Sequence, residues 1–360
     1  YLFIYKKSGI LLVLILEVFM NTDFLKGLID DIFLTDSPSG FFHNINNVLI
    51  LKLKQMGYDD VRVNNKGNVE VNIKGLDHCK RVAVAAHVDT LGLMVRSINA
   101  DGTLKVTNVG GPSIPTLDGE YCKIVTRDNK IYTGTILSTS PAVHVYKDSA
   151  TKPRDIDNMI VRIDEKVKSR ADVIKLGINN GDYICYDSKT VVTESGYLKS
   201  RFIDDKGSVC VILAVLEYMH ANNILPKYDV TCYFTNYEEV GHGGATITEV
   251  SEFVAVDMGC VGLDLAGDEC KVSICAKDSA GPYDYELTNH LISLAKEANL
   301  GYVVDIFPYY SSDVSASLRA GLDCKGALIG SGVSASHGME RTHLDGLLNT
   351  MKLLYLYLTK

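Results

Sequence analysis

The chain has 360 residues, of which 46% are hydrophobic and 22% are charged, a composition typical of a globular protein with a large core. This length favours two domains, and the composition excludes a disordered chain. The net charge of −8 and the lack of any dense run of Lys and Arg argue against nucleic acid as a partner.

Residues 1–19 resemble the start of a secreted protein only in part. The pair Lys6-Lys7 precedes an apolar run at residues 9–16, as in a signal peptide, but Glu17 interrupts the run and no small-residue cleavage site follows. The run is also too short to cross a membrane. We therefore expect residues 1–19 to be a non-native or unstructured leader, with Met20 as the natural start and no attachment to a membrane.

Residues 20–91 mix helical and strand patterns. Apolar residues spaced for helices occupy 22–34 and 46–56, with a cluster of turn-forming residues between them. An alternating segment follows at 61–73, and a run of Val and Ala at 81–86 has the pattern of a buried strand. This mixture predicts the first part of an α/β domain.

The middle of the chain has a different pattern. Short β-type segments separated by Gly, Asp and Asn turns follow one another, and helical spacing is weak. These segments are residues 104–106, 121–125, 131–136, 159–163 and 183–186. The pattern predicts a small β domain at 92–187, inserted into a larger α/β domain made of residues 20–91 and 188–360.

After residue 201, helices and strands alternate again. The predicted helices are 209–219, 287–298 and 347–358, and the predicted strands are 228–235, 253–256, 302–307 and 324–329. The first two of these strands lead into acidic residues, Glu238-Glu239 and Asp257. The second part of the chain is therefore predicted to complete the α/β domain.

Residues with metal-binding chemistry stand where apolar segments stop. His87 and Asp89 follow the buried run at 81–86, Asp204-Asp205 precede a helix, and His337 follows the last predicted strand. Because ligands of open α/β sheets bind at the carboxyl ends of strands, we expect these side chains to meet. Imidazoles together with carboxylates suit a pair of divalent metal ions, so the pattern indicates a two-metal hydrolase.

Several of these positions allow more than one interpretation. His337 and His343 lie six residues apart, and the spacing from the closing helix favours His337 as a ligand, with His343 as a helix-start residue. Asp205 fits either a helix cap or a contact behind the ligands. Asp313 fits either a helix cap or a position that lines the site.

Five motifs occur in the same order as in a known family. They are Ala86-His87-Val88-Asp89, residues 200–206, residues 236–245, Val256-Asp257-Met258-Gly259 and Ser311-Ser312-Asp313. With Val109-Gly110-Gly111 they resemble the tetrahedral or glutamyl aminopeptidases, a family of co-catalytic metallopeptidases with some relatives labelled as cellulases. The resemblance spans residues 20–360. It implies an α/β fold in which a mixed-sheet, three-layer metallopeptidase domain carries an inserted small β-barrel-like dimerisation domain.

Position by position, the resemblance implies a ligand set. Asp204 would bridge two metals, His87 and Asp257 would complete one site, and Glu239 and His337 the other. Two dications would be balanced by these three carboxylates and one bridging hydroxide, which favours a hydroxide near neutral pH. Zinc and cobalt suit such ligands best, and manganese is also compatible.

The resemblance also implies residues that act beside the metals. Glu238 would be the general base that takes the proton of the attacking water, and Asp89 would orient the imidazole of His87. The sequence departs from the family pattern at Thr90, where Glu is frequent, and at Lys206, where Arg is usual. Neither position is an implied ligand.

The predicted activity is the removal of N-terminal residues from peptides with a free amino terminus. One alternative is a metal-independent glycoside hydrolase of the endoglucanase type, which needs two carboxyl groups and leaves the histidines unexplained. Another is a non-catalytic scaffold, although Glu238 and all the implied ligands are retained. The motifs do not contain the pocket for the substrate side chain, so its preference is not predicted.

The resemblance and the cysteine content also lead to expectations about the oligomeric state and the cellular compartment. In the resembled family the insert builds dimers, and dimers form a hollow tetrahedral particle, so we expect a homo-oligomer, a dimer at least and more often a dodecamer. Nine scattered cysteines without a Cys-x-x-Cys pair fit a reduced, cytoplasmic protein.

Overall fold

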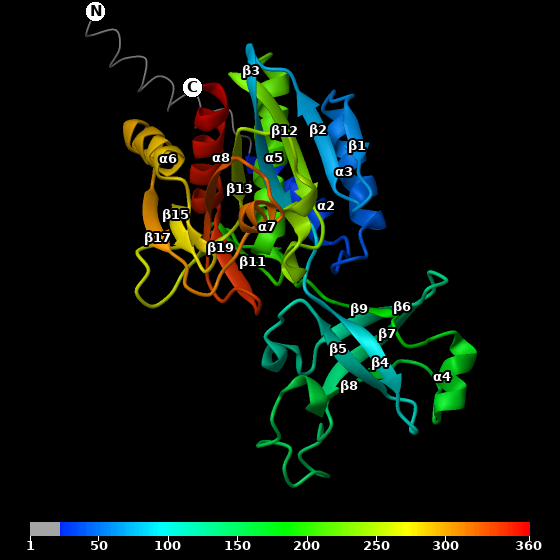
Figure 1. Ribbon diagram of the computed structural model, residues 1–360. Coiled ribbons are helices and arrows are strands. Elements are labelled where there is room, and N and C mark those ends of the chain that lie inside the picture. Colours follow the sequence, from blue (N-terminus) through cyan, green and yellow to red (C-terminus); the bar gives the residue numbers. More distant parts are fainter. Residues whose placement is uncertain (1–21) are drawn as a thin grey trace, which may run out of the picture.

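The computed structural model describes residues 22–360, so the predicted leader at 1–19 lies outside the described residues. The described chain forms an α/β body and a smaller β barrel that projects from it (Figure 1). The C-terminal helix belongs to the body. Within residues 22–360, the helices are too short or too polar to cross a membrane.

A mixed sheet of ten strands runs through the body along the path β1-β2-β12-β3-β13-β18-β15-β16, with β14 paired to β18 and β17 paired to β15. The strands are β1 (Val61–Val63), β2 (Val69–Ile73), β3 (Asp77–His87), β12 (Tyr228–Thr235), β13 (Glu252–Val256), β14 (Gly259–Cys260), β15 (Val272–Asp278), β16 (Gly281–Pro282), β17 (Tyr302–Ile306) and β18 (Lys325–Val333). The central strands β12, β3, β13 and β18 are parallel, so their carboxyl ends lie at one edge.

Helices cover both faces of this sheet. One layer contains α2 (Thr22–Phe33), α3 (His43–Gln55), α5 (Ile203–Ala221), α6 (Tyr285–Glu297) and α8 (Leu344–Thr359), and a smaller layer contains α7 (Asp313–Arg319) and the 3-10 helix η4 (Gly243–Thr246). In β3, Val82 and Val84 belong to the core on the first side, whereas Ala83 and Ala85 belong to the core on the other. The predicted three-layer α/β fold is therefore confirmed.

The alternating segment at 61–73 is a hairpin of two strands rather than one strand. β1 and β2 pair antiparallel, and Gly67 in the turn between them has φ 85°. A side chain at Gly67 would also collide with the ring of Phe42, so the turn requires glycine. Valines alternate with polar residues on both sides of the turn, so the sequence pattern alone did not reveal the turn.

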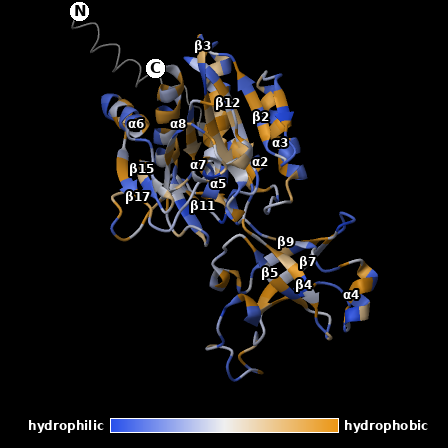
Figure 2. Cartoon of the chain, viewed as in Figure 1, coloured by the Kyte–Doolittle hydropathy of each residue, from blue (hydrophilic) through white to orange (hydrophobic). Residues whose placement is uncertain are grey.

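The inserted part is a closed barrel of six antiparallel strands in the order β4-β5-β8-β7-β6-β9. They are β4 (Gly92–Ile98), β5 (Leu104–Val109), β6 (Tyr121–Val125), β7 (Ile131–Ser138), β8 (Met159–Ile163) and β9 (Tyr183–Tyr186), joined by the 3-10 helices η1 (Ile114–Leu117) and η2 (Ile156–Asn158) and by α4 (Arg170–Leu176). Leu93, Val106, Ile136 and Val161 are among the residues of its separate core. Figure 2 shows hydrophobic residues on the strands of both sheet and barrel.

A buried ion pair joins the barrel to the body. Arg201, just before α5, pairs with Glu120 of the barrel, and both side chains are less than 5% exposed. Arg201 also donates to the carbonyl of Thr116 at 3.0 Å, and Lys189 contacts Glu120 at 2.8 Å. Separating the barrel from the body at this point would leave a buried charge without its partner, which is costly. The ion pair therefore favours the observed contact between the two parts.

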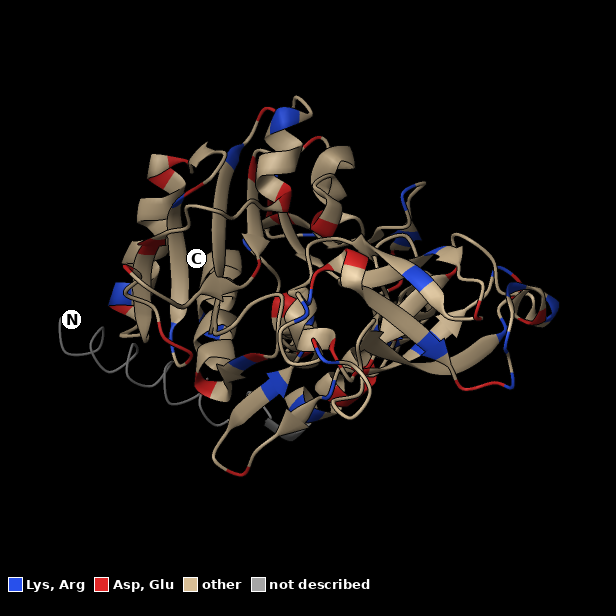
Figure 3. Ribbon diagram, turned by 90° about the horizontal axis from the view of Figure 1, so that it is seen from below, with Lys and Arg blue, Asp and Glu red and all other residues tan. Residues whose placement is uncertain are grey.

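A small sheet continues the junction. It consists of β10 (Val191–Val192), β11 (Tyr197–Ser200) and β19 (Glu340–His343). The chain thus returns from the barrel beside the segment that precedes α8. Figure 3 shows that acidic and basic residues are interspersed over both parts of the described chain.

Candidate functional site

The candidate site lies at the carboxyl edge of the central parallel strands. His87 is the last residue of β3, and Glu238 and Glu239 begin the short 3-10 helix η3 (Glu238–Val240) after β12. Asp257 directly follows β13, and Asp204 stands in the first turn of α5. Parallel neighbouring strands thus bring together residues that are far apart in the chain.

Asp204 stands between two imidazoles. Its Oδ1 lies 3.0 Å from Nε2 of His87, and its Oδ2 lies 3.5 Å from Nε2 of His337. Glu239 lies beside it, with Oε2 at 3.6 Å from Nε2 of His337. Burial opposes ionisation of Asp204, but hydrogen bonds with His337 and His87 outweigh it and hold the pKa of this carboxyl below its usual range.

Two overlapping groups of side chains offer metal-ligand atoms. His87, Asp204 and Glu239 form one group, and His87, Asp205 and Asp257 the other, with the ligand atoms of each group within 4.8 Å of one another. Oε1 of Glu239 and Oδ1 of Asp205 are buried without a hydrogen-bond partner among the described residues. Unsatisfied buried carboxylate oxygens are costly, and cations would satisfy them.

The crowding of carboxylates shifts their ionisation. Burial raises the pKa of Asp257 to about 7 and that of Glu239 to about 8, and the charge of Asp204 adds to both shifts. The hydrogen bond with Asp204 raises the pKa of the His337 imidazole to about 10. The cluster therefore attracts positive charge, and the residues present fit divalent cations.

The backbone around Asp89 orients the imidazole of His87. Nδ1 of His87 donates to the carbonyl oxygen of Asp89 at 2.9 Å, whereas Oδ1 of Asp89 is farther away, at 3.6 Å. The carboxylate of Asp89 instead accepts the backbone N–H groups of Glu238 at 3.1 Å and Glu239 at 3.3 Å. Asp89 thus holds both His87 and the glutamate pair, through different atoms.

Asp313 supports the glutamate loop from behind. Its Oδ2 accepts the hydroxyl of Thr235 at the end of β12, and its Oδ1 accepts the N–H of Gly244 at 2.5 Å. A side chain at Gly243 would lie 2.4 Å from Oδ1 of Asp313, so the glycine permits this close approach. Of the two interpretations of Asp313, the structure supports neither: it anchors a loop, and Ser312 occupies the helix cap.

The barrel contributes to the position of His337. Nδ1 of His337 donates to the carbonyl of Gly111 at 2.9 Å, and the carbonyl of His337 accepts the N–H of Ser113 at 2.9 Å. Both partners lie between β5 and η1. These contacts turn Nε2 of His337 towards Asp204.

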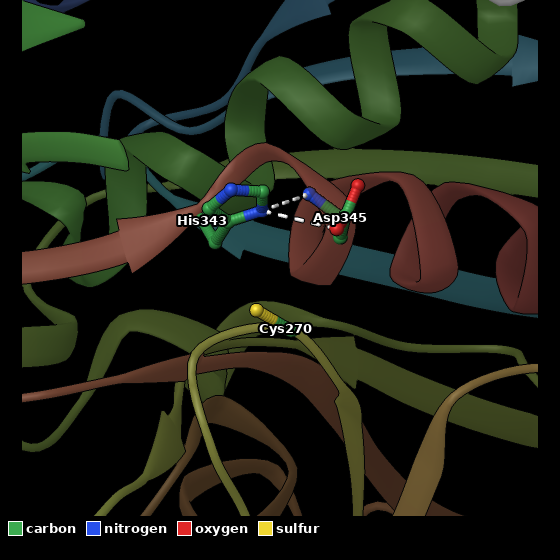
Figure 4. A group of neighbouring side chains, drawn as sticks. All are labelled: Cys270, His343 and Asp345. Atoms are coloured by element: carbon green, nitrogen blue, oxygen red, sulfur yellow. Dashed lines mark hydrogen bonds and ion pairs between the residues drawn. The ribbon is translucent and has the colours of Figure 1, made fainter. Parts of the chain in front are cut away.

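His343 lies elsewhere, in a group with Asp345 and Cys270 (Figure 4). Its Nδ1 accepts the N–H of Asp345 at 3.0 Å and caps α8, and its Nε2 donates to the carbonyl of Ser195 at 2.9 Å. Both ring nitrogens are thus engaged by the backbone. The structure brings His337 to the cluster and leaves His343 at the start of a helix.

The two departures from the family pattern lie at the back of the site. The hydroxyl of Thr90 donates to the carbonyl of Leu91 at 3.1 Å, and Nζ of Lys206 donates to the carbonyl of Thr35 at 2.6 Å. Lys206 is almost fully buried, which lowers its pKa to about 8. Thr90 and Lys206 thus each donate a hydrogen bond to a backbone carbonyl and help to hold that backbone segment in place.

Glu340 is a site residue that the sequence interpretation missed. It is 1% exposed, its Oε2 accepts the N–H of Asp204 at 3.0 Å, and its Oε1 accepts the N–H of His337 at 2.9 Å. One carboxylate thus positions the two residues that face each other across the cluster. Its place three residues after His337 was the only sequence signal, and the motifs gave it no role.

The cluster opens into a cleft. Asp204, Glu238, Glu239, Asp257 and His337 line a cavity of about 220 Å³ together with Gly241, Tyr309, Tyr310 and Ser311. The glutamates and Asp257 give the cleft a negative wall. A small cationic group can therefore approach the buried cluster from solvent.

Comparison with known proteins identifies the family of the chain. A family model described as M42 glutamyl aminopeptidase matches residues 67–353. The chain belongs to this family. It is thus a metallo-aminopeptidase, a hydrolase of peptide bonds, and the resemblance seen in the motifs is confirmed.

Similar proteins match this M42 aminopeptidase over most of its length. A Bacillus subtilis (strain 168) protein named “Putative aminopeptidase YhfE” is 43% identical over 332 residues, which cover 92% of this chain and 96% of that protein. The crystal structure of a TET aminopeptidase from a Thaumarchaeota archaeon has a TM-score of 0.84 at 20% identity, covering 94% and 97% of the two chains.

A second solved structure shows the same fold. The Pyrococcus horikoshii TET1 peptidase, described as able to assemble into a tetrahedron or a large octahedral shell, has a TM-score of 0.82 at 22% identity. The match covers 93% of this chain and 99% of that one. The inserted barrel and the mixed sheet are therefore shared with these peptidases.

Replacement of Glu340 tests its positioning role. Glu340→Ala should lower metal affinity about 10- to 100-fold, because the N–H groups of Asp204 and His337 lose their acceptor. Glu340→Gln, which retains one carbonyl acceptor, should lose less, and Glu297→Ala at an exposed site on α6 should bind metal normally. Metal content after dialysis at graded free metal measures the effect. Normal affinity in Glu340→Ala would contradict the role.

Proposed function

We propose that this enzyme removes N-terminal residues from peptides with two divalent cations held by His87, Asp204, Glu239, Asp257 and His337. The observation that carries the proposal is the position of Asp204, whose two carboxylate oxygens each face a different imidazole. A carboxylate in that position suits a bridge between two cations.

We assign the remaining ligands in two pairs about Asp204. His87 and Asp257 would complete one cation site, and Glu239 and His337 the other. Asp205 also lies near His87 and Asp257, but its Oδ2 accepts the N–H of His87 at 3.2 Å. We therefore assign Asp205 to holding the end of β3, behind the ligands.

The cations fit the charge and the ligand types of the site. Imidazole and carboxylate ligands suit zinc or cobalt, and manganese is also compatible. When bound, such ions supply polarisation of the scissile carbonyl and a lowered pKa for the attacking water. The remaining chemistry falls to the side chains of this chain.

Glu238 has the properties of a general base. It lines the cleft, its Oε2 lies 3.8 Å from Nε2 of His87, and it is outside both groups of ligand atoms. Burial and then the neighbouring carboxylates raise the pKa of Glu238, against the opposing charge of His87. Glu238 would accept the proton of the attacking water and pass it to the departing amine.

The cleft also suits an exopeptidase. A peptide begins with an amino group, and a bound cation with an open position would accept that group as a neutral amine. The cleft lined by Glu238, Glu239 and Asp257 opens to solvent, so a peptide terminus can reach that position. An acetylated terminus has no amine lone pair to offer, so a free amine would be required.

The substrate test compares free and N-acetylated aminoacyl peptides with enzyme supplied with zinc, cobalt or manganese. Only the free-amine peptides should be cleaved, because the nitrogen of an acetylated terminus is a poor ligand for a bound cation. Chelation should abolish this activity, and added metal should restore it. Chelator-resistant turnover by metal-free protein, or equal cleavage of acetylated peptides, would reject the proposal.

Glu238→Gln tests the proton acceptor. The variant should bind metal as the wild type does and lose about 10²- to 10⁴-fold in kcat, because only a general base has been removed. Metal content and kcat are measured on the same samples. A variant that loses metal but keeps turnover in metal-supplemented buffer would show that Glu238 and Glu239 have exchanged roles.

We further propose that the barrel mediates self-association in the cytoplasm, first to dimers and then to a dodecamer. Tyr121 and Ile131 on the barrel are 71% and 62% exposed, and Leu34 at the end of α2 is 65% exposed. Tyr121 and Leu34 border a cavity of about 470 Å³ between body and barrel. The assembly described for the TET1 relative supports the proposed self-association. The unpaired cysteines of the described chain support a reducing compartment such as the cytoplasm.

Light scattering on metal-loaded protein measures the assembly. We expect a dimer or a larger species at micromolar concentration, because exposed apolar side chains on the barrel favour burial against another copy. The double variant Tyr121→Glu with Ile131→Glu should dissociate, whereas Leu76→Glu at an exposed position on the body should not. A monomeric wild type would contradict the proposal.

A further inference from the structure

A second cavity opens beside the cleft of the candidate site. It has a volume of about 470 Å³ and shares Tyr309, Tyr310 and His337 with the cleft. A substrate whose scissile carbonyl lies at the cluster can therefore extend the side chain of its first residue into this cavity. The cavity is large enough for a leucyl, methionyl or phenylalanyl side chain.

The walls of this cavity are mainly apolar, with Ser336, His337 and the hydroxyls of Tyr309 and Tyr310 as the polar part. Met258 directly follows Asp257, Cys260 lies in β14, Leu263 and Leu265 come from the loop after β14, and Phe307 follows β17. Burial raises the pKa of Cys260 to about 12, so its thiol is uncharged. The described residues that line the cavity include no Asp, Glu, Lys or Arg, and the one imidazole, of His337, belongs to the proposed metal site.

A nearby carboxylate supports one wall instead of facing the substrate. Oδ1 of Asp305 accepts the N–H of Ala266 at 2.8 Å, and Oδ2 accepts the N–H of Gly267 at 2.9 Å. Both oxygens are thus engaged in holding the loop that carries Leu263 and Leu265. Asp305 is buried, at 6% exposure, and is not among the residues that line the cavity, so it does not present a charge to a substrate side chain.

The mouth of the cavity has exposed apolar side chains. Leu263 is 93% exposed and Tyr309 is 99% exposed, and both line the cavity. Large apolar side chains left in solvent at the rim of a pocket mark a surface that a ligand covers. A bound apolar side chain would contact both residues and exclude water from them.

On these grounds we propose that this cavity binds the side chain of the N-terminal residue and selects large uncharged apolar residues over acidic and basic ones. The inference rests on the proposed function and names its substrate class. An acidic or basic side chain would lose its hydration without gaining a partner of opposite charge, which costs more than the loss of apolar contact.

A panel of aminoacyl chromogenic substrates on metal-loaded wild-type enzyme provides the first test. Values of kcat/KM for Leu, Met and Phe substrates should exceed those for Glu and Lys substrates by about 100-fold or more. A preference for Glu or Lys, or equal rates for all, would overturn the inference while leaving the aminopeptidase proposal intact. Absence of hydrolysis of every substrate would instead overturn the proposed function.

A charge introduced at the rim provides the second test. Leu263→Arg should raise the ratio of kcat/KM for Glu over Leu substrates by about 10-fold or more, because the guanidinium would pair with the acidic side chain. Leu225→Arg, at a 51% exposed leucine after α5, is the matched control and should leave the ratio unchanged. Metal content confirms that both variants are loaded. An unchanged ratio in loaded Leu263→Arg would show that substrate side chains do not enter this cavity.

Discussion

Buried negative charge is the constraint on which the site depends. Asp204, Glu238, Glu239 and Asp257 converge at the edge of the sheet, where burial raises the pKa of the last three. Desolvated carboxylates at such separations repel one another unless cations stand between them. The two imidazoles offer partial compensation, and divalent ions at the proposed sites would offer the rest.

The carboxylates of the site divide into two kinds according to their partners. Asp89, Asp205, Asp313 and Glu340 accept backbone N–H groups and hold the loops in place. Asp204 faces imidazoles, and Glu239, like Asp205, keeps a buried oxygen without a hydrogen bond among the described residues. Under the proposed assignment, the same functional group would serve either as a positioning group or as a ligand.

The barrel also supplies contacts that position residues of the site. It begins shortly after β3 and ends with β9, and β10 and β11 lead from it to α5. It therefore separates His87 from Asp204 in sequence while both stay at one edge in space. The carbonyl of Gly111 orients His337, and Glu120 holds Arg201 beside α5. Assembly through the barrel would therefore act on the same contacts that position the site.

Local patterns in the sequence indicated most helices and strands of the body and a β-rich insert, because strand and helix periods are properties of neighbouring residues. The order of the motifs, through their resemblance to a family, implied the barrel and the imidazole and carboxylate ligands. The hairpin at 61–73 could not be recognised from such periods, since its turn continues the alternation of its strands. The spacing from the closing helix favoured His337 over His343, but only the tertiary structure placed His337 beside Asp204, gave Glu340 its contacts and showed a mainly apolar cavity beside the cleft. These features depend on contacts such as that between His337 and Gly111, which are 226 residues apart, and no local pattern encodes them.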